Sequence, residues 1–262
     1  MTAPLTVSML MSSPVVSVGP DTPLDTAYRI LADRKVSSVP VVDAGGKALG
    51  VVSLTDLLRI GRLQPASLAG VASLDLPAEP VRDHMHAGVV TVSTDAPPTR
   101  AARLMAEHHI HRVYVEEEGA LVGVFSIEEV LLAVRVLEID TPIGQRMTKP
   151  VITLPLTATL AEATARLDRV GVTGIVILDE HDHPAGTFTQ NEALASRHRA
   201  PDIAVERVMS YALVIQHGKT PLHRAAAHAY EARARRVLVV DDGKLEGLLT
   251  GLDFARILAG AG

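Results

Sequence analysis

The sequence of 262 residues has no cysteine and no tryptophan, and only 3% of its residues are aromatic. Without cysteine the chain can form neither a disulfide framework nor a thiolate metal site, and nothing in it requires an oxidising compartment. We therefore expect a cytoplasmic location. Because aromatic side chains are scarce, we also expect a core of closely interleaved Val, Leu, Ile, Ala and Met side chains.

Long apolar stretches are missing as well. The longest, such as residues 172–178, fall far short of the ~18 residues that a membrane-spanning helix needs. Residues 1–14 contain neither the basic start nor the long apolar run of a secretory signal. The net charge of −5 argues against a surface for nucleic acid, which usually needs an excess of basic residues. We expect no membrane partner and no nucleic-acid partner.

The most informative pattern is a short segment that recurs four times. In each copy a glycine is followed, three residues later, by Ser or Thr, and an acid follows after three more. The copies are GVVSLTD (50–56), GVFSIEE (123–129), GTFTQNE (186–192) and GLLTGLD (247–253). Each copy lies near the end of a unit of about fifty residues. Each unit has a methionine near its start, and the four methionines are Met11, Met85, Met147 and Met209. Internal repetition of this kind decides the fold.

Within a unit, the hydrophobic periodicity changes in a fixed order. A short apolar strand after the methionine is followed by a turn rich in Pro, Asp and Thr. Leu24, Ala27, Tyr28 and Leu31 then have the i, i+3, i+4, i+7 spacing of a helix with one apolar face. A second strand, a hairpin turn, a third strand ending in the recurring segment, and a last helix complete the unit. The fold class is therefore α+β, with four β-α-β-β-α repeats, each too small to bury its sheet alone.

The spacing of the repeats predicts how they pair. A long linker, residues 61–80, separates the first two, residues 196–204 separate the last two, and the polar segment 135–142 joins the pairs. We expect two domains, each with its repeats packed about a pseudo-twofold axis. The first is 1–138, with repeat 1 at about 7–60 and repeat 2 at 81–134; the second is 139–262, with repeat 3 at 143–197 and repeat 4 at 205–258.

The hydroxyl and the acid of the recurring segment allow two interpretations. One is a capping box, in which the two side chains bind backbone N–H groups at the start of a helix. The other is a ligand site, because a helix N-terminus that follows a strand and a glycine favours an anion such as phosphate. The hydroxyl would then contact the phosphate, and the acid would accept hydrogen bonds from the two hydroxyls of a ribose.

The combined pattern resembles the cystathionine β-synthase (CBS) domain family, two of whose repeats form a Bateman module. The resemblance covers nearly the whole chain as four CBS repeats in two modules. It implies a regulatory sensor whose clefts between paired repeats bind AMP, ADP, ATP or S-adenosylmethionine. No catalytic cofactor is implied. In that family the Asp of the segment contacts the ribose and the Ser or Thr lies near the phosphate.

Carried onto this chain, the resemblance ranks the four copies. Repeats 1 and 4 match it, so Asp56 and Asp253 are the predicted ribose ligands, and Ser53 and Thr250 are predicted to lie near phosphate. The other two copies have a glutamate whose extra methylene displaces the carboxylate. Their second sites are therefore doubtful, and they consist of Ser126 with Glu129 and Thr189 with Glu192.

Basic pairs precede the second strand of each even repeat. They are His111-Arg112 and Arg235-Arg236, where the odd repeats have Ser37-Ser38 and Thr173-Gly174. In the γ subunit of AMP-activated kinase, which these segments resemble, such a pair reaches the ligand phosphates. Arginine suits this role because its planar guanidinium donates two parallel hydrogen bonds. The alternative is a solvated strand entry, at which the arginine stem only covers apolar surface.

Metal binding and catalysis find little support. Histidines cluster at 108–111 and 181–183, but no acid or cysteine set completes a site, so we expect no metal. No nucleophile elbow and no phosphate-binding loop of the Walker type occurs, so we do not expect an enzyme. The alternative function is a structural dimerisation or interaction module with empty clefts. Since the sequence contains no effector domain, we expect an unknown effector protein, and a homodimer is compatible with either function.

Overall fold

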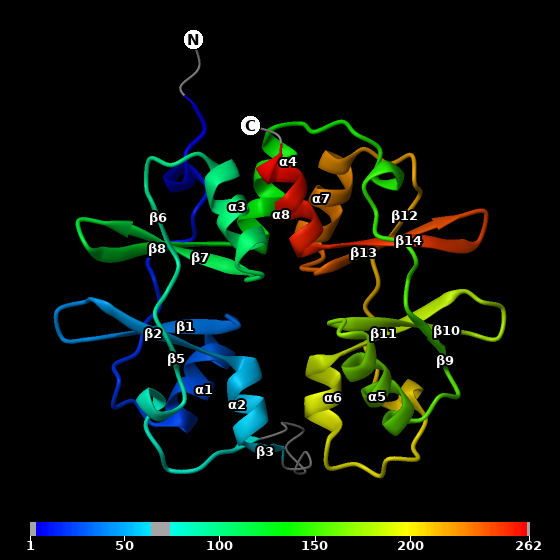
Figure 1. Cartoon of the computed structure of the whole chain (residues 1–262), viewed down its shortest axis with the longest axis horizontal. Helices are drawn as coiled ribbons and strands as arrows, with labels where there is room; N and C mark the ends of the chain where they lie inside the picture. Colours follow the sequence, from blue (N-terminus) through cyan, green and yellow to red (C-terminus); the bar gives the residue numbers. More distant parts are fainter. Residues whose placement is uncertain (1–3, 64–73, 261–262) are drawn as a thin grey trace.

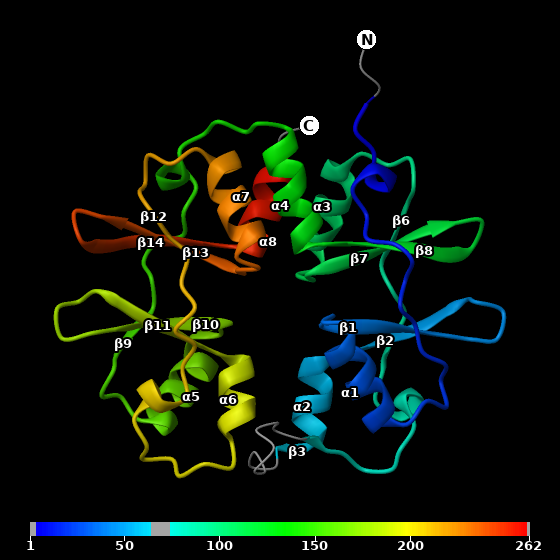
Figure 2. The same cartoon turned by 180° about the vertical axis from the view of Figure 1, so that it is seen from behind.

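The computed structural model describes residues 4–63 and 74–260, and it has the predicted α+β fold. Four units of similar shape surround a common centre, with a two-stranded hairpin of each unit directed outward (Figures 1 and 2). Three parts of the predicted domains lie outside the described residues. They are residues 64–73 of the linker, residues 1–3 at the start of the first domain and residues 261–262 at the end of the second.

Repeat 1 follows the predicted order of elements. After the short helix η1 (Val7–Met9) it contains α1 (Leu24–Asp33), β1 (Ser38–Val42), β2 (Ala48–Ser53) and α2 (Leu54–Ile60). Leu24, Ala27 and Leu31 of α1 are fully buried or nearly so, which confirms the apolar face that their spacing predicts. In the β1–β2 turn the Asp43 carboxylate accepts hydrogen bonds from the backbone N–H groups of Gly45 and Lys47. This is the local chemistry that favours Asp in hairpin turns.

The other three repeats contain the same elements. Repeat 2 comprises η2 (Val81–Asp83), β5 (His86–Ala87), β6 (Thr91–Ser93), α3 (Pro98–Glu107), β7 (Arg112–Glu117), β8 (Ala120–Ser126) and α4 (Ile127–Val136). Repeat 3 comprises η3 (Ile143–Gln145), β9 (Thr153–Pro155), α5 (Leu160–Val170), β10 (Gly174–Leu178), β11 (Pro184–Thr189) and α6 (Gln190–Ser196). Repeat 4 comprises η4 (Val205–Arg207), β12 (Ile215–Gln216), α7 (Leu222–Glu231), β13 (Arg236–Asp241), β14 (Lys244–Thr250) and α8 (Gly251–Ala259). The short strands β3 (Arg62–Leu63) and β4 (Leu74–Asp75) pair with each other within the predicted linker, residues 61–80.

The first strand of each repeat pairs in parallel with the second. In repeats 2, 3 and 4 these strands are β6, β9 and β12, next to β7, β10 and β13. In repeat 1 the strand is shorter than predicted, because only Val18 pairs with Val41. The hairpin strands pair antiparallel in all four repeats. In repeats 2, 3 and 4 the hairpin and the first strand form a three-stranded sheet, whereas in repeat 1 the third strand is β5 of repeat 2, which pairs antiparallel with β2.

Each methionine that opens a repeat packs on the partner repeat. Met11 lies against Gly123 of repeat 2, where a Cβ on the glycine would come within 2.3 Å of the methionine sulfur. Met85 lies against Gly50 in the same way, while Met147 meets Gly247 and Met209 meets Gly186. The contact explains both the methionine and the glycine of the recurring segment, since any larger side chain would collide with the sulfur. It also places repeat 1 in contact with repeat 2, and repeat 3 in contact with repeat 4.

The largest apolar core joins repeats 2 and 4, across the two pairs. Helix α3 packs on α8, and α4 packs on α7 and α8. Phe125 and Phe254 are fully buried or nearly so in this core. Repeats 1 and 3 each have a separate core, and they meet through α2 and α6. No helix in the described ranges is both long and apolar enough to cross a membrane.

Candidate functional site

A cavity of about 860 Å³ lies between the four repeats and receives side chains from all of them. This volume is near the upper end of the range for small-molecule sites, roughly 300–1,000 Å³. The helices that follow the recurring segments begin at its wall, at Leu54 of α2, Ile127 of α4, Gln190 of α6 and Gly251 of α8. The segments that the sequence singles out therefore border one common space.

One part of the cavity, which we call the 1/2 lobe, lies where repeats 1 and 2 meet. Its wall comes from residues 12–16 and 31–40 of repeat 1, and its floor from residues 124–129 of repeat 2. The two repeats are joined here by backbone hydrogen bonds in both directions between Ser12 and Val124, at 3.0 and 2.9 Å. Pro14, Val16 and Pro40 make part of the wall apolar.

The equivalent part, the 3/4 lobe, lies where repeats 3 and 4 meet. Its wall comes from residues 210–214 and 229–238 of repeat 4, and its floor from residues 187–192 of repeat 3. Backbone hydrogen bonds between Thr187 and Ser210, at 2.8 Å in both directions, join the repeats. Each lobe is therefore built from the same positions of a repeat and its partner.

All four recurring segments form capping boxes at the starts of α2, α4, α6 and α8. In repeat 1, Oδ2 of Asp56 accepts hydrogen bonds from the backbone N–H and the hydroxyl of Ser53, at 2.9 and 2.6 Å. In repeat 4, Oδ2 of Asp253 accepts the same two bonds from Thr250, at 2.8 and 2.7 Å. The capping interpretation is confirmed in every repeat, and it occupies only one oxygen of each acid.

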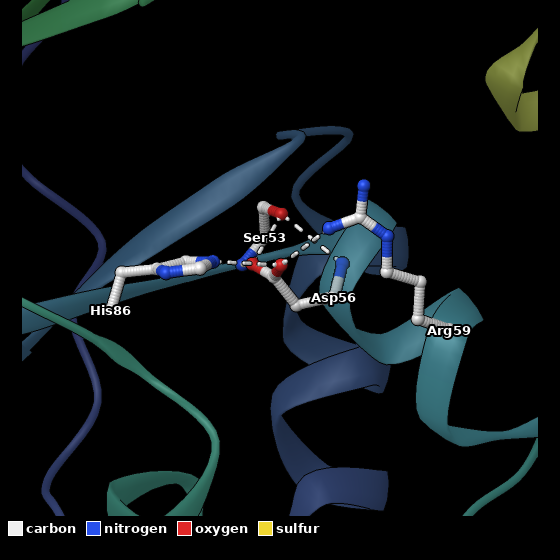
Figure 3. Close-up of polar contacts among 4 residues, drawn as sticks. All are labelled: Ser53, Asp56, Arg59 and His86. Atoms are coloured by element: carbon white, nitrogen blue, oxygen red, sulfur yellow. Dashed lines mark hydrogen bonds and ion pairs between the residues drawn. The ribbon is translucent and has the colours of Figure 1, made fainter. Parts of the chain in front are cut away.

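The second oxygen of the aspartates faces basic side chains of the protein. Figure 3 shows Oδ1 of Asp56 beside His86, whose Nε2 lies 3.0 Å away, and Arg59, whose Nη1 lies 3.8 Å away. Oδ1 of Asp253 is 2.8 Å from Nη1 of Arg256. Both aspartates are buried, and neither is among the residues that line the cavity. The two predicted ribose ligands thus have partners of their own.

The glutamates of the other two copies do line the cavity. In the 1/2 lobe, Oε2 of Glu129 takes the capping bonds from Ser126, and Oε1 accepts a hydrogen bond from the Ser12 hydroxyl at 2.6 Å. In the 3/4 lobe, Oε2 of Glu192 takes the capping bonds from Thr189, and Oε1 has no hydrogen-bond partner within 4–63 and 74–260. The residues ranked as doubtful from sequence are the ones whose carboxylates border the large cavity.

The contact between Ser12 and Glu129 has a counterpart that sequence reasoning missed. Ser12 and His86 each follow the methionine that opens a repeat, and each side chain binds the acid of the partner repeat. One position therefore supplies a hydroxyl in one cleft and an imidazole in the other. The only sequence signal was the fixed distance of these two residues from the methionine.

The arginines that end the two basic pairs bridge paired repeats. Arg112 stands opposite Ser126 in its hairpin, and its guanidinium donates to the Ser38 carbonyl at 3.2 Å and to the Ser37 hydroxyl. Arg236 donates to the Thr173 hydroxyl at 3.0 Å. Burial lowers the pKa of both guanidinium groups from the usual arginine value. They line the cavity as predicted for phosphate ligands, but part of their hydrogen-bonding capacity is already used.

The first members of the pairs, His111 and Arg235, both line the cavity. Burial, and then the positive charges of Arg235, Arg112 and Arg236, lower the pKa of His111 from its usual value of 6.5. Sequence reasoning missed two further cations of the lining, Lys35 and Arg233, which lie three residues before the starts of β1 and β13. Their equivalent positions in repeats 1 and 4 were the signal that could have found them.

The electrostatic character of the cavity follows from its lining. Six basic side chains line it, namely Lys35, His111, Arg112, Arg233, Arg235 and Arg236. Three acids accompany them, which are Glu128, Glu129 and Glu192. The cavity is therefore positive even with His111 neutral, although the chain as a whole carries a net charge of −5.

The histidine cluster at 181–183 lies in the β10–β11 turn. There the Asp179 carboxylate accepts hydrogen bonds from the backbone N–H groups of His181 and His183, at 2.9 and 2.8 Å. The bond from the His183 backbone is the main cause that lowers the pKa of Asp179. Among the described residues, no three His, Cys, Asp or Glu side chains are grouped so that they could hold a metal ion.

Comparison with known proteins agrees with this architecture. Protein MJ1225 from Methanocaldococcus jannaschii is 18% identical, and the match covers 97% of this chain and all of that one at a TM-score of 0.75, which shows the shared fold. Uncharacterized protein MJ1404 from the same organism is 25% identical over 274 residues, which cover 97% of this chain and 62% of that protein. CBSX2, solved in complex with AMP, is 26% identical and covers 50% of this chain and 97% of that one. Its TM-score is 0.42, too low to support an inference.

The curated relatives are mostly longer than the matching part. The chain spans between 14% and 26% of the length of three of them. The model of the CBS domain family matches residues 7–62, 81–136, 142–198 and 205–260. These four matches coincide with the repeats and their capping boxes. The chain therefore belongs to the CBS domain family, as its recurring segments predict.

Proposed function

We propose that the chain binds an adenosine-containing ligand in the central cavity and transmits its occupancy to an effector. The observation that supports this most directly is the charge of the cavity, which is positive in an acidic chain. Positive charge that lines a concave site attracts anions such as phosphate. The ligand class comes from membership of the CBS family, and the choice among AMP, ADP, ATP and S-adenosylmethionine stays open.

The lining suggests how each lobe would hold such a ligand. The apolar walls, which include Pro14 and Val16 in the 1/2 lobe and Ala212 and Val214 in the 3/4 lobe, would cover the base. The ribose hydroxyls would donate to the second carboxylate oxygen of the glutamate on the floor, as acids bind ribose in other nucleotide folds. In Glu129 this oxygen also accepts from the Ser12 hydroxyl, so the ribose would use its remaining lone pair. Phosphates would meet arginine side chains, whose forked donors match their geometry.

The predicted sites at Asp56 and Asp253 stay predictions. A ribose there would have to displace His86 and Arg59 from Asp56, or Arg256 from Asp253. Giving up these contacts reduces the net gain from the ribose hydrogen bonds. We therefore place the lobes with Glu129 and Glu192 first and the aspartate clefts second.

We infer a regulatory rather than a catalytic role. Both floor glutamates are held in capping boxes, so neither is placed as a mobile general base. A ligand can shift the protein toward one arrangement only if it binds that arrangement more tightly. Residues of all four repeats line the cavity, so an occupant would contact more than one repeat at once. The effector, the cytoplasmic location and a homodimer remain predictions.

A structural module with empty clefts is the second candidate function. One observation favours it, namely that every acid of the recurring segments already caps a helix. In that case the segments would only stabilise the fold, and the module would act by association with other chains.

Thermal melting with a small ligand panel distinguishes the two functions. We expect at least one of AMP, ADP, ATP and S-adenosylmethionine to raise the melting temperature, because a ligand at a hundredfold excess over Kd contributes ~2.7 kcal/mol. The ligand should be recovered unchanged after incubation. If all four leave the melting temperature unaltered, the structural module is the better account. Turnover of the ligand would overturn the regulatory role.

A further inference from the structure

The two lobes of the cavity differ in charge although they are built from equivalent positions. In the 3/4 lobe the wall carries Arg233, Arg235 and Arg236. Repeat 1 has Lys35, Ser37 and Ser38 at these three positions. Two arginines of one wall are thus replaced by small neutral residues in the other.

The floors of the lobes add to this difference. In the 1/2 lobe, repeat 2 contributes Arg112 together with Glu128 and Glu129. Two cations, Lys35 and Arg112, therefore meet two acids. In the 3/4 lobe three arginines meet one acid, Glu192, which leaves an excess of two positive charges. Only the 3/4 lobe therefore has an excess of positive charge that can bind an anion.

The cationic side chains of the two lobes also differ in the hydrogen bonds that they already make within the protein. Arg112 is bound to the carbonyl of Ser38 and the hydroxyl of Ser37. Arg233 and Arg235 make no ion pair and no side-chain hydrogen bond with any residue in the described part of the chain, and both are exposed. Since an arginine offers five N–H donors, these two can turn toward a phosphate without losing a protein partner.

This inference rests on the proposed function and divides it between the lobes. We propose that the 3/4 lobe binds a nucleoside polyphosphate, while the 1/2 lobe binds an adenosyl compound without phosphate, such as S-adenosylmethionine. An anion of several charges is costly to bury where cations and acids already balance, but it is stabilised beside three arginines with one opposing acid. The charge at the position of Ser37 and Arg235 selects the ligand.

Calorimetry on the full chain tests this division. ATP and S-adenosylmethionine are titrated separately, and each is then titrated into protein saturated with the other. We expect one equivalent of each ligand, bound with little change when the other is present. Added salt should weaken ATP binding far more than S-adenosylmethionine binding, because salt screens the interaction of charged groups.

Substitutions assign each ligand to its lobe. Arg235→Ser should weaken ATP about tenfold or more, the usual size of a lost charge-assisted hydrogen bond, and leave S-adenosylmethionine unaffected. Glu129→Gln should weaken S-adenosylmethionine several-fold and spare ATP, and Glu192→Gln should do the reverse. Arg224→Ser is the matched control, since Arg224 is exposed on α7 and outside the cavity lining but removes the same charge.

A variant that gains a binding site tests the division most strictly. Ser37→Arg should allow ATP to enter the 1/2 lobe, so that a second equivalent binds and S-adenosylmethionine is displaced from it. Direct competition between the two ligands in the unaltered protein would overturn the division, as would equal losses of both in Arg235→Ser. Failure of both ligands to bind would instead contradict the proposed function itself.

Discussion

The two ends of the molecule are built from equivalent helices but are joined very differently. Where repeats 2 and 4 meet, α3 and α4 pack on α7 and α8 in one apolar core. Where repeats 1 and 3 meet, α2 and α6 touch through few residues, with Leu194 on the core of repeat 1 and Arg197 donating to the Leu58 carbonyl. The 2/4 end therefore acts as a fixed frame, and we expect ligand-induced movement at the 1/3 end.

The largest expected effect of a single substitution lies in the frame. Phe254→Ala should lower the free energy of unfolding by about 3–5 kcal/mol, because it removes a large side chain that is almost fully buried between repeats 2 and 4. The comparison is Leu194→Ala at the other end, where a partly buried side chain should cost about 1 kcal/mol or less. Chemical denaturation measures both. Equal losses would show that the two ends are equally tight.

The starts of α4 and α8, which pack closely, allow a second comparison of stability between the two ends. A Cβ on Gly251 of α8 would lie 2.5 Å from Cγ2 of Ile127 of α4, so Gly251→Ala should cost roughly 1–3 kcal/mol by overpacking. Gln190 occupies the equivalent position at the 1/3 end and is exposed, so Gln190→Ala should change stability by at most about 0.5 kcal/mol. If Gly251→Ala leaves the free energy of unfolding unchanged, the packing between repeats 2 and 4 is looser than the account requires.

Much of this architecture follows from local sequence. The repeat, its α1-type helix and all four capping boxes could be predicted because spacing within a few residues decides them. The contacts of Met11 with Gly123 and of His86 with Asp56 could not, because they join residues of different repeats that only the pairing brings together. For the same reason, the union of two lobes in one cavity was invisible in the sequence. The ranking of the aspartates above the glutamates used the match to the family's segment and the side-chain length, without the partners that the fold supplies.

A pair of acids tests which clefts are used. Glu192→Ala should weaken ATP about tenfold or more, since the acid faces the cavity, whereas Asp253→Ala should have a much smaller effect. Each substitution also removes a capping box and should cost about 1 kcal/mol of stability, so the two are matched in that respect. Calorimetry measures the affinities. A greater loss with Asp253→Ala would place the ligand in the cleft predicted from sequence.

The smallest expected effect is a pH dependence that arises at the centre of the cavity. The pKa of His111 is lower in the folded chain than its usual 6.5, so the unfolded chain binds this proton more readily. The contribution of neutral His111 to the free energy of unfolding is therefore fully present above about pH 6.5, and it is lost as the pH falls toward the lower pKa of the folded chain. His111→Gln should reduce this slope in melts between pH 7 and 5. A bound polyphosphate should reduce it too, because it offsets the neighbouring positive charges. An unchanged slope in the variant would contradict the assignment to His111.

A crystal structure of the chain grown with ATP tests the central claim most directly. We predict nucleotide density in the 3/4 lobe, with the ribose on Glu192 and the phosphates against Arg235. An empty cavity at saturating ATP, or nucleotide held only in the cleft of Asp56 or Asp253, would contradict the account.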